Sequence, residues 1–424
     1  MSTTEVVQKK RGKSGEHYDV VIIGGGASGM MAAGRAAERG KRVLLLEKNK
    51  ELGKKLGITG GGRCNITNAE SDLHTFLDFF GEAKPFLYSP ASQFWVEDTY
   101  NFFQKRGLPI VEQAKKRCFP KTERATDVVK VMQRYASQSG VTIRTGVKVR
   151  GFVVEHEEIQ GVKTTEGTFW ASQFILAAGG FSHQETGASI EWINWVKDLG
   201  HKTHKPGPDI VPLKADDTWV HALSGTTLSF MKITFTQGTK KVQKKGKLLF
   251  THFGLSGPLI LNAAHQVKEL LKAGPVATTV DLCPDTEVGT VRKRVLATFD
   301  EHKNKALRNV LKEFLPNGMD KGFIDYLPKE LLDTKVHSVS KEDRERLADL
   351  TKALPLTVTG TMGYDWAVVS DGGVDLTEVD MKTMASKLHP NLFFTGDVLH
   401  INRPSGGFSL QLCWTTGWVA GSHV

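Results

Sequence analysis

The chain has 424 residues, of which 40% are hydrophobic and 24% charged, a composition typical of a globular protein with two or three domains. Its four cysteines lack CxxC spacing, which argues against a disulfide scaffold or a structural zinc site and fits a reducing cytosol. No run of about 18 apolar residues exists, so no membrane span is expected.

The charge balance leaves the partner open. The 56 Lys and Arg residues exceed the 46 Asp and Glu residues, giving a net charge of +10. This excess permits an anionic partner such as nucleic acid, although a mildly basic soluble protein would show it as well. Residues 1–16 are polar and basic without the apolar core of a signal peptide, and we expect a flexible tail there in a cytoplasmic protein.

Residues 18–47, YDVVIIGGGASGMMAAGRAAERGKRVLLLE, predict a strand, a turn, a helix and a second strand. In the G-x-G-x-x-G turn, Gly24 permits a tight bend, Gly26 lets the backbone approach a pyrophosphate, and Gly29 lets the helix pack closely on the strand. Glu47 ends the second strand, where an acid binds the ribose of an adenosine. The predicted dinucleotide-binding residues of this unit are Gly24, Gly26, Ala27, Ser28, Gly29, Glu47 and Lys48.

Two later segments favour FAD over NAD as the dinucleotide. Residues 174–182, FILAAGGFS, read as a strand that breaks at Ala178 and Gly179. Residues 391–421 read as a strand, a Gly-Asp pair, a loop and an apolar helix. Such a pair typically holds the ribityl chain or the pyrophosphate of FAD, and the helix directs its N-terminus toward the flavin. The cofactor-binding residues predicted in these two segments are Ala178, Gly179, Gly396, Asp397, Gly407, Phe408 and Ser409.

With these motifs in place, the chain resembles the HI0933-like (BaiN/RdsA-like) family of NAD(P)/FAD-dependent oxidoreductases. The resemblance is strongest in GKKLGITGGGRCNITN (53–68) and extends, in order, over most of the chain. Two regions depart from the family pattern: the sequence after Ala177, and GDVLH at 396–400 with the following INRPSGG. The other matching segments are RCFPKTERATDVV (117–129), LGHKTHKPGPDIVPL (199–213), LLFTHFGLSGPLIL (248–261) and the block at 357–387.

The resemblance implies an α/β protein built on a Rossmann-like FAD-binding domain of the two-dinucleotide-binding-domain flavoprotein type. This domain would comprise 17–207 and 370–424. A β-rich, barrel-like domain, 208–285 and 353–369, would be inserted into it, and a small helical subdomain, 286–352, would be inserted into the barrel. Strand-like alternation followed by charged, helix-like segments agrees with this order.

The resemblance also implies that Gly60, Gly61 and Gly62 form a bare backbone wall beside the FAD. Arg63 and Asn65 would donate hydrogen bonds to flavin oxygens or to a bound anion. A purely structural turn is the alternative. Val147 is a further expected cofactor contact, and no metal site is expected.

Four residues are candidates for catalysis. The thiol of Cys64 would protonate a carbanion, although buried cysteines are usually inert. His252 and His400 would act as an acid or a substrate anchor, because histidine titrates near neutral pH; a structural histidine is the alternative for each. Arg403 would hold a phosphate or carbonyl oxygen, with a plain surface arginine as the alternative.

Within the family, the implied activity is reduction of an activated C=C bond with hydride taken from NADH or NADPH. Two substrate types are associated with it: a uridine in ribosomal RNA, which gives dihydrouridine, and enones of bile-acid-like steroids. The basic charge and the lysine run at 239–247 favour RNA, and a second basic cluster lies at 114–124. Phe253, Trp219 and Phe230 are then available for stacking.

Other functions stay open at this point. They are a small-molecule enone reductase and a flavin-containing RNA-binding factor without turnover. Flavin-dependent methyl transfer is disfavoured, because its cysteine pattern is absent. The sequence contains no second dinucleotide fingerprint, and it determines neither the choice between NADH and NADPH nor the oligomeric state.

Overall fold

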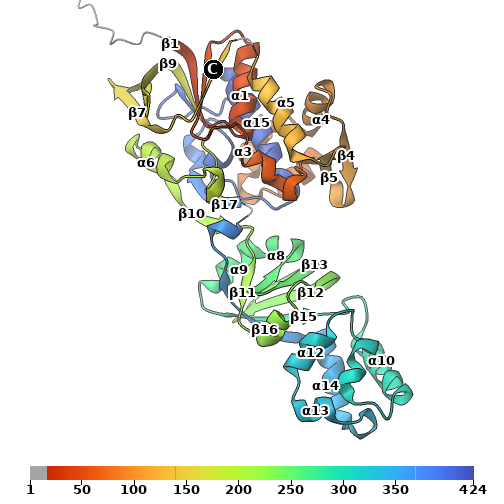
Figure 1. Ribbon diagram of the computed structural model, residues 1–424. Coiled ribbons are helices and arrows are strands. Elements are labelled where there is room, and N and C mark those ends of the chain that lie inside the picture. Colours follow the sequence, from red (N-terminus) through yellow and green to blue (C-terminus); the bar gives the residue numbers. More distant parts are fainter. Residues whose placement is uncertain (1–16, 139, 368) are drawn as a thin grey trace, which may run out of the picture. The chain divides into compact units, whose positions relative to one another are not determined.

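The computed structural model describes residues 17–138, 140–367 and 369–424, so the tail expected at 1–16 lies outside the described residues. The chain divides into two compact units (Figure 1). The first unit contains the chain up to Pro206 together with Asp371–Val424, and the second contains Gly207–Ser370. None of the helices in the described part of the chain is long and apolar enough to cross a bilayer.

A seven-stranded sheet forms the centre of the first unit. Its strands follow the order β6-β2-β1-β9-β8-β7, and β18 pairs with β9 off this path. The pairs β6–β2, β2–β1, β1–β9 and β9–β18 are parallel, and β9–β8 and β8–β7 are antiparallel. The strands are β1 (His17–Ile23), β2 (Val43–Glu47), β6 (Val141–Thr145), β7 (Val149–Glu155), β8 (Glu158–Thr164), β9 (Gly167–Leu176) and β18 (Leu392–Phe394).

The central strands are buried on both faces, as their continuous apolar sequences predict. All five residues of β2 are buried, and so are the last four of β1. The predicted strand–turn–helix–strand unit at 18–47 is therefore confirmed, with α1 (Ala27–Glu38) between β1 and β2. The strand and the apolar helix predicted within 391–421 are confirmed as β18 and α15 (Phe408–His423).

Helices α1 and α15 pack closely because small residues line their contact. A Cβ added at Gly417 would lie 2.5 Å from the carbonyl oxygen of Ser28, and one at Gly421 would lie 2.6 Å from that of Ala32. These glycines let two backbones approach where any larger residue would force them apart. The two helices come from opposite ends of the described chain and lie together beside the sheet (Figure 1).

A small antiparallel sheet, β3-β5-β4, adjoins the N-terminus of α15. Thr67 in β3 contacts that terminus, because a Cβ added at Gly407 would lie 2.3 Å from its carbonyl group. The strands of the small sheet are β3 (Thr67–Asn68), β4 (Ile110–Gln113) and β5 (Arg117–Pro120). The other helices of this unit are α2 (Leu73–Asp78), α3 (Lys84–Gln93), α4 (Val96–Lys105), α5 (Ala125–Ala136) and α6 (Glu191–Asp198).

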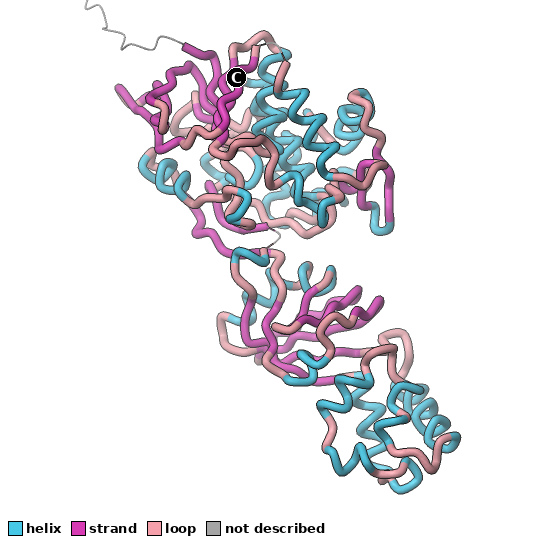
Figure 2. Tube along the Cα trace, in the orientation of Figure 1, coloured by secondary structure: helices cyan, strands magenta, loops and turns pink. Residues whose placement is uncertain are grey.

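The second unit contains a closed antiparallel barrel with the order β11-β14-β13-β12-β15-β16. Figure 2 distinguishes its strands from the neighbouring helices. The barrel strands are β11 (Leu213–Ala215), β12 (Thr227–Gln237), β13 (Lys240–Thr251), β14 (Gly254–Ser256), β15 (Val276–Asp281) and β16 (Leu354–Thr361). Its short helices are α7 (Thr218–Ala222), α8 (Pro258–Leu261) and α9 (Ala264–Leu271).

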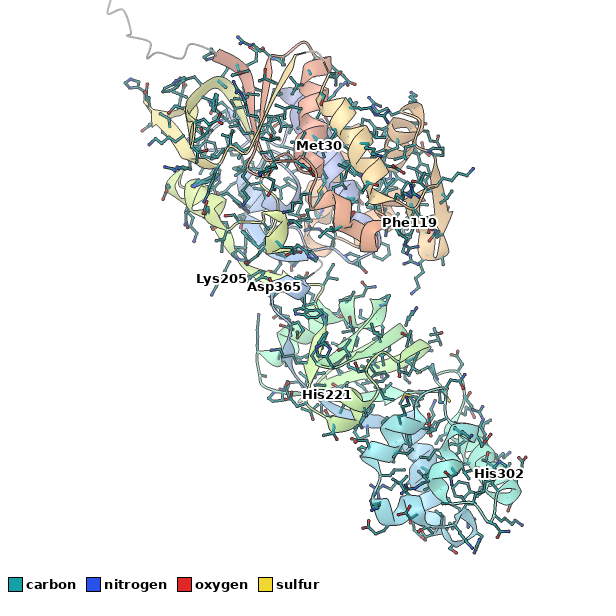
Figure 3. The ribbon with its side chains drawn as sticks, viewed as in Figure 1. Met30, Phe119, Lys205, His221, His302 and Asp365 are labelled. Carbon is teal, nitrogen blue, oxygen red and sulfur yellow. The ribbon has the colours of Figure 1, made fainter. Side chains whose placement is uncertain are left out.

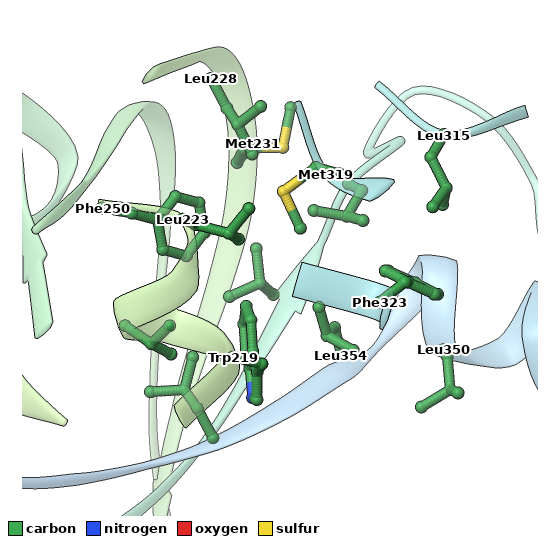
Figure 4. Packing of buried hydrophobic residues seen from close by; sticks show 14 of the residues in the cluster. Trp219, Leu223, Leu228, Met231, Phe250, Leu315, Met319, Phe323, Leu350 and Leu354 are labelled. Carbon is green, nitrogen blue, oxygen red and sulfur yellow. The ribbon is translucent and has the colours of Figure 1, made fainter. Parts of the chain in front are cut away.

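The helices between β15 and β16 share one hydrophobic core with the barrel. Figure 4 shows Trp219, Leu223 and Phe250 from the barrel side of this core and Met319 and Phe323 from the helical side. These helices are α10 (Val288–Glu301), α11 (Leu311–Phe314), α12 (Asp320–Tyr326), α13 (Lys329–Asp333) and α14 (Lys341–Lys352).

The core position of Trp219 overturns one expectation. Its side chain is 2% exposed and its indole Nε1 donates to the carbonyl oxygen of Pro355 at 3.2 Å, so it cannot stack on a substrate base. The lysines of 240–247 lie along β13, which begins directly after a tight turn where Lys240 pairs with Gln237 of β12.

The chain passes between the two units within a two-stranded sheet formed by β10 (Thr203–Asp209) and β17 (Val369–Val374). Gly372 in β17 has a φ of +86°, and a Cβ there would lie 2.6 Å from the Cα of Pro206. Glycine is therefore required where these two strands cross closely.

Candidate cofactor-binding site

The three glycines of the dinucleotide turn have different surroundings. A Cβ added at Gly24, whose φ is +108°, would lie 2.4 Å from the carbonyl oxygen of Ala177. One at Gly29 would lie 1.9 Å from the carbonyl oxygen of Gly24. One at Gly26 would meet nothing within 4 Å. The packing of the protein itself thus requires Gly24 and Gly29, whereas Gly26 borders open space that a ligand can enter.

The first turn of α1 is prepared for an anion. Gly26 is its N-cap, no side chain caps it, and the turn contains no acidic residue. The positive end of the helix dipole therefore has no acidic side chain within the first turn itself, which suits a bound anion. Ser28 is 5% exposed and its Oγ accepts a hydrogen bond from Thr395 at 3.1 Å, so its side chain ties α1 to the end of β18. Ala27 is the first residue of the helix.

Glu47 stabilises the dinucleotide turn. Its Oε2 accepts from the Gly25 N–H at 2.8 Å, and its Oε1 accepts from the Asn49 N–H and Nδ2 at 2.7 and 2.8 Å. The carboxylate is 8% exposed and lies at the carboxyl end of β2, as predicted. Val147 is buried and donates its N–H to the Glu47 carbonyl oxygen at 3.0 Å. Lys48 is half-buried, and this burial lowers the pKa of its ammonium group. The ribose contact of Glu47 stays a prediction.

The glycine-rich turn at 60–62 is exposed bare backbone. Gly60, Gly61 and Gly62 have φ values of +59°, +65° and +83°, which favour glycine. Nothing lies within 4 Å of a Cβ placed at Gly61 or Gly62, whereas one at Gly60 would lie 2.9 Å from the amide nitrogen of Asn65. Gly60 is thus needed for the turn itself, and the next two leave space beside the backbone.

Arg63 and Asn65 attach this turn to the small sheet. The guanidinium of Arg63 lies 4.5 Å from the ring centroid of Phe119 in β5, and its Nη1 lies 3.6 Å from Oε1 of Glu123. Oδ1 of Asn65 accepts from the Cys118 N–H at 3.2 Å. Phe119 is labelled in Figure 3. Both side chains therefore have protein partners, and their predicted contacts with a cofactor remain untested.

The Gly-Asp pair after β18 is fixed by α15 and by Arg403. Gly396 has a φ of +61° and donates its N–H to Oγ1 of Thr416 at 2.9 Å. Arg403 forms an ion pair with Asp397, donates to Oγ of Ser409 at 3.1 Å and to the Ile401 carbonyl oxygen at 2.5 Å. Arg403 is only 5% exposed, so the alternative of a surface arginine is wrong.

The first turn of α15 resembles that of α1. Gly407 is the N-cap with a φ of +105°, no side chain caps the helix, and its first turn has no acidic residue. Phe408 is 4% exposed and packs against Phe76 with 4.8 Å between ring centroids. The aromatic ring therefore anchors the helix in the unit, and a first turn without an acidic residue suits an anionic or polar ligand.

Lys55 is a site residue that the sequence analysis missed. Its Nζ donates to the Gly180 carbonyl oxygen at 3.0 Å, next to the break after β9. Burial lowers its pKa, and the nearby carboxylate of Asp397 opposes that shift. At this break Gly179 has a φ of +74° with no atom within 4 Å of an added Cβ, and Ala178 is half-buried. The available sequence signal was that Lys55 belongs to the same GKKLGITGGGRCNITN segment as the glycine-rich turn.

Among the catalytic candidates, His400 has an unusual environment. Its ring stacks on that of His204 with 3.9 Å between centroids, and Nε2 of His204 lies 2.9 Å from Oδ2 of Asp375. Burial and then the neighbouring His204 lower the pKa of His400. Its Nδ1 is buried and has no hydrogen-bond partner within the described part of the chain, while the backbone of Gly372 beside the ring opposes the lowering of the pKa.

Cys64 and His252 have contrasting environments. Cys64 is fully buried with a φ of +60°, and burial raises the pKa of its thiol to about 12. This environment is that of an inert structural cysteine. His252 is exposed in the second unit, where its ring contacts Phe253 edge-on at 5.0 Å. The structure therefore brings Cys64, His400 and Arg403 into one unit and leaves His252 in the other.

The segment 199–213 and the block at 357–387 meet in a buried hydrogen-bond network. Nδ1 of His201 lies 3.0 Å from Oε2 of Glu378, and its Nε2 lies 3.0 Å from Oγ of Ser386. This Ser-His-Glu order matches that of a hydrolase triad, but Ser386 is 2% exposed and its Oγ accepts two backbone N–H groups, from Leu388 and His389. The network therefore serves the fold. Within the described ranges, no group of three or more His, Cys, Asp or Glu residues could hold a metal ion.

The fold and the match to a family model define the class of the protein. It has the Rossmann-type FAD-binding fold of flavoenzymes, with a closed six-stranded barrel in its second unit. The chain belongs to the HI0933-like family of FAD-dependent oxidoreductases, because a model described as the HI0933-like protein Rossmann domain matches residues 18–423.

Two relatives are similar over nearly their full length. The chain is 29% identical over 407 residues to a 3-dehydro-bile acid delta(4,6)-reductase of Clostridium scindens, covering 94% of this chain and 97% of the relative. It is 28% identical over 414 residues to a ribosomal RNA dihydrouridine synthase of Escherichia coli, covering 96% and 98%.

Solved structures agree on the fold. The 3-ketosteroid delta1-dehydrogenase of Sterolibacterium denitrificans has a TM-score of 0.51 at 12% identity, with 96% of this chain and 99% of that chain covered. The quinol fumarate reductase FrdA of Escherichia coli has a TM-score of 0.51 at 13% identity, with 96% and 69% covered. At these identities the likeness concerns the fold alone.

Proposed function

We propose that this protein is an FAD-dependent reductase that uses hydride from NADH or NADPH to reduce the C5=C6 bond of a uridine in ribosomal RNA, giving dihydrouridine. The observation that carries the cofactor part is the open backbone at Gly26, Gly61, Gly62 and Gly179, together with the N-termini of α1 and α15, which have a glycine at the cap and no acidic residue in the first turn. These positions fit a dinucleotide, because its phosphates and its ring oxygens need backbone donors and close approach.

The chain's own residues have distinct tasks in this proposal. The first turn of α1, with Gly26 as its N-cap, binds the pyrophosphate. The Gly60–Gly62 turn and the first turn of α15 orient the flavin ring. Lys55 supplies a positive charge and Asp397 a negative charge to the same site, and the two side chains interact electrostatically. When bound, FAD supplies hydride transfer to the activated C=C bond. His400 is the group we assign to the proton, since its Nδ1 is buried without a protein partner in the described ranges.

The RNA part of the proposal is supported by charge as well as by the similar dihydrouridine synthase. Five lysines lie along β13, and four of them are exposed. Lys245 pairs with Asp285 at 3.6 Å and lies 5.8 Å from the centroid of the exposed Phe230 ring. No ion pair of the other four occurs among the described residues. The lysines are Lys240, Lys241, Lys244, Lys245 and Lys247.

The decisive experiment is mass spectrometry of nucleosides from ribosomal RNA of cells with and without the gene. We expect one dihydrouridine to disappear on deletion and to return with the intact gene, but not with the Gly26→Val variant. Purified protein, NADPH or NADH, and ribosomal RNA from the deletion strain should then restore the modification in vitro. An unchanged dihydrouridine content would contradict the RNA substrate.

A second candidate function is reduction of a small-molecule enone. The similar bile-acid reductase, at 29% identity, favours it specifically. The chemistry is shared, since both substrates contain a C=C bond conjugated to a carbonyl group. If ribosomal RNA is unchanged, the purified protein should be screened for NAD(P)H oxidation stimulated by 3-oxo-Δ4 steroids, and stimulation there would establish this alternative.

A further inference from the structure

The hairpin of β4 and β5 has a strained, basic tip. Lys115 and Lys116 join the two strands, and both have left-handed backbone conformations, with φ values of +63° and +56°. Both side chains are exposed. Two consecutive non-glycine residues in this region are unusual, and such strain persists only where the surroundings hold it.

Asn68 holds this tip against the N-terminus of α15. Its Nδ2 donates to the carbonyl oxygens of both Lys115 and Gly406, each at 3.2 Å. The Ala69 N–H donates to the Lys116 carbonyl oxygen at 2.7 Å. The two lysines therefore have a fixed position beside the residues that begin α15, which is the helix assigned above to the flavin.

The charge of the hairpin segment is largely available to a ligand. Residues 110–124 contain five Lys and Arg residues against two Glu residues. Lys116 pairs with Glu70 at 2.7 Å, and Glu123 lies 3.6 Å from Arg63. Lys115, Lys121 and Arg124 are exposed, and the described residues include no ion-pair partner for them.

An exposed aromatic ring completes this surface. Phe79, after α2, is 49% exposed, and its ring lies 4.7 Å from that of Phe408, the first residue of α15. Gly406, which Asn68 binds, precedes Phe408 by two positions. A continuous series of contacts thus links a half-exposed ring to the basic tip across the start of α15.

We propose that the β4–β5 hairpin and Phe79 form a binding site for single-stranded RNA in the first unit. The three unpaired cations contact backbone phosphates, and Phe79 stacks on a base next to the start of α15. Positive side chains beside an exposed ring are the combination that binds unpaired nucleic acid without regard to sequence. This inference rests on the proposed function and names the residues that receive its substrate.

The test measures binding of a fluorescein-labelled 15-residue oligouridylate to the FAD-loaded protein across a range of KCl concentrations. The variant replaces Lys115, Lys121 and Arg124 by glutamine. Each phosphate contact contributes about −0.7 to the slope of log K against log salt, so the variant should flatten the slope by about 2. At low salt its affinity should be at least about tenfold weaker.

A matched control removes the same number of charges elsewhere in the first unit. Arg144, Arg150 and Lys163 are exposed on β6, β7 and β8, and in Figure 1 β7 lies on the opposite side of this unit from β4 and β5. Their replacement by glutamine should leave affinity and slope unchanged. A charge-conserving variant with Lys115→Arg, Lys121→Arg and Arg124→Lys should bind like the wild type, which separates charge from folding.

A second variant, Phe79→Ala, should weaken binding about tenfold at every salt concentration with an unaltered slope, because stacking involves no counterion release. If the wild type binds RNA and both variants bind it equally well with the same slope, the hairpin site is wrong while an RNA substrate stands. If the wild type does not bind RNA, the RNA substrate and this site are both wrong.

Discussion

Replacing Gly26 by valine should separate cofactor binding from folding. Gly26 has φ −81° and ψ −167°, an extended conformation that valine adopts without strain, and nothing lies within 4 Å of the new Cβ. The stability of the apoprotein should therefore change by no more than about 0.5–1 kcal/mol, as for a half-buried site whose new side chain meets no packed neighbour.

FAD affinity, in contrast, should fall steeply. The isopropyl group would occupy the space through which a pyrophosphate reaches the first turn of α1. Loss of two hydrogen bonds to a charged group, at about 1.5–3 kcal/mol each, amounts to about 3–6 kcal/mol. This corresponds to an increase of two to four powers of ten in the Kd of FAD. The assays are the visible spectrum of the purified protein, titration of the apoprotein with FAD, and urea denaturation of the apoprotein.

Two other glycines serve as controls. Gly289→Val also enters open space, in α10 of the second unit, and should retain normal FAD affinity. Gly29→Ala should destabilise the apoprotein by roughly 3 kcal/mol or more, because its Cβ would lie 1.9 Å from a carbonyl oxygen and the backbone must move. A Gly26→Val protein that binds FAD as tightly as the wild type would refute the pyrophosphate assignment, and one that unfolds would refute the reasoning about open space.

Three further results follow from buried groups. Arg403→Met should destabilise the protein by about 3 kcal/mol in urea denaturation, because it leaves the partly buried Asp397 carboxylate without its ion-pair partner. Arg403→Met combined with Asp397→Leu should recover most of this loss. Burial lowers the pKa of His201, so the unfolded chain binds more protons than the folded protein below about pH 6.5. The free energy of unfolding should therefore fall as the pH drops through that region, and His201→Gln should reduce this dependence. If the urea midpoints of this variant showed the same pH profile as the wild type, the assignment to His201 would be contradicted. The thiol of Cys64, with its pKa raised to about 12, should resist iodoacetamide at pH 8 until the protein is unfolded, and rapid labelling of the native protein, located by peptide mass spectrometry, would contradict its burial.

The dinucleotide turn could be predicted from the sequence because the residues that determine its structure are adjacent in the chain. The β-branched run before Gly24, the alanine-rich segment after Gly29 and the apolar strand ending at Glu47 each have a characteristic composition, and the observed elements match them. The apolar helix α15, which follows β18, could be predicted for the same reason. Family resemblance added the order of the remaining elements, and the Rossmann-type FAD-binding fold is confirmed.

The partners of individual polar side chains could not be predicted, because they depend on contacts distant in sequence. Arg403 and Asp397 are only six residues apart, but their burial follows from the packing of α15 in the unit. Lys55 meets the Gly180 carbonyl oxygen across 125 positions. The RNA hypothesis makes Trp219 available for stacking, whereas closure of the barrel places its side chain in the core.

The interruption of the first unit has a consequence for how the protein is made. β18 extends the central sheet beside β9, and α15 covers α1 through Gly417 and Gly421, so this unit is incomplete until the last segment, Asp371–Val424, has been translated. The second unit is one continuous stretch with its own hydrophobic core, and it leaves the ribosome earlier. A nascent chain therefore completes this unit only after Asp371–Val424 has been translated, and a stop before that segment yields a product that lacks both the Gly-Asp pair and α15.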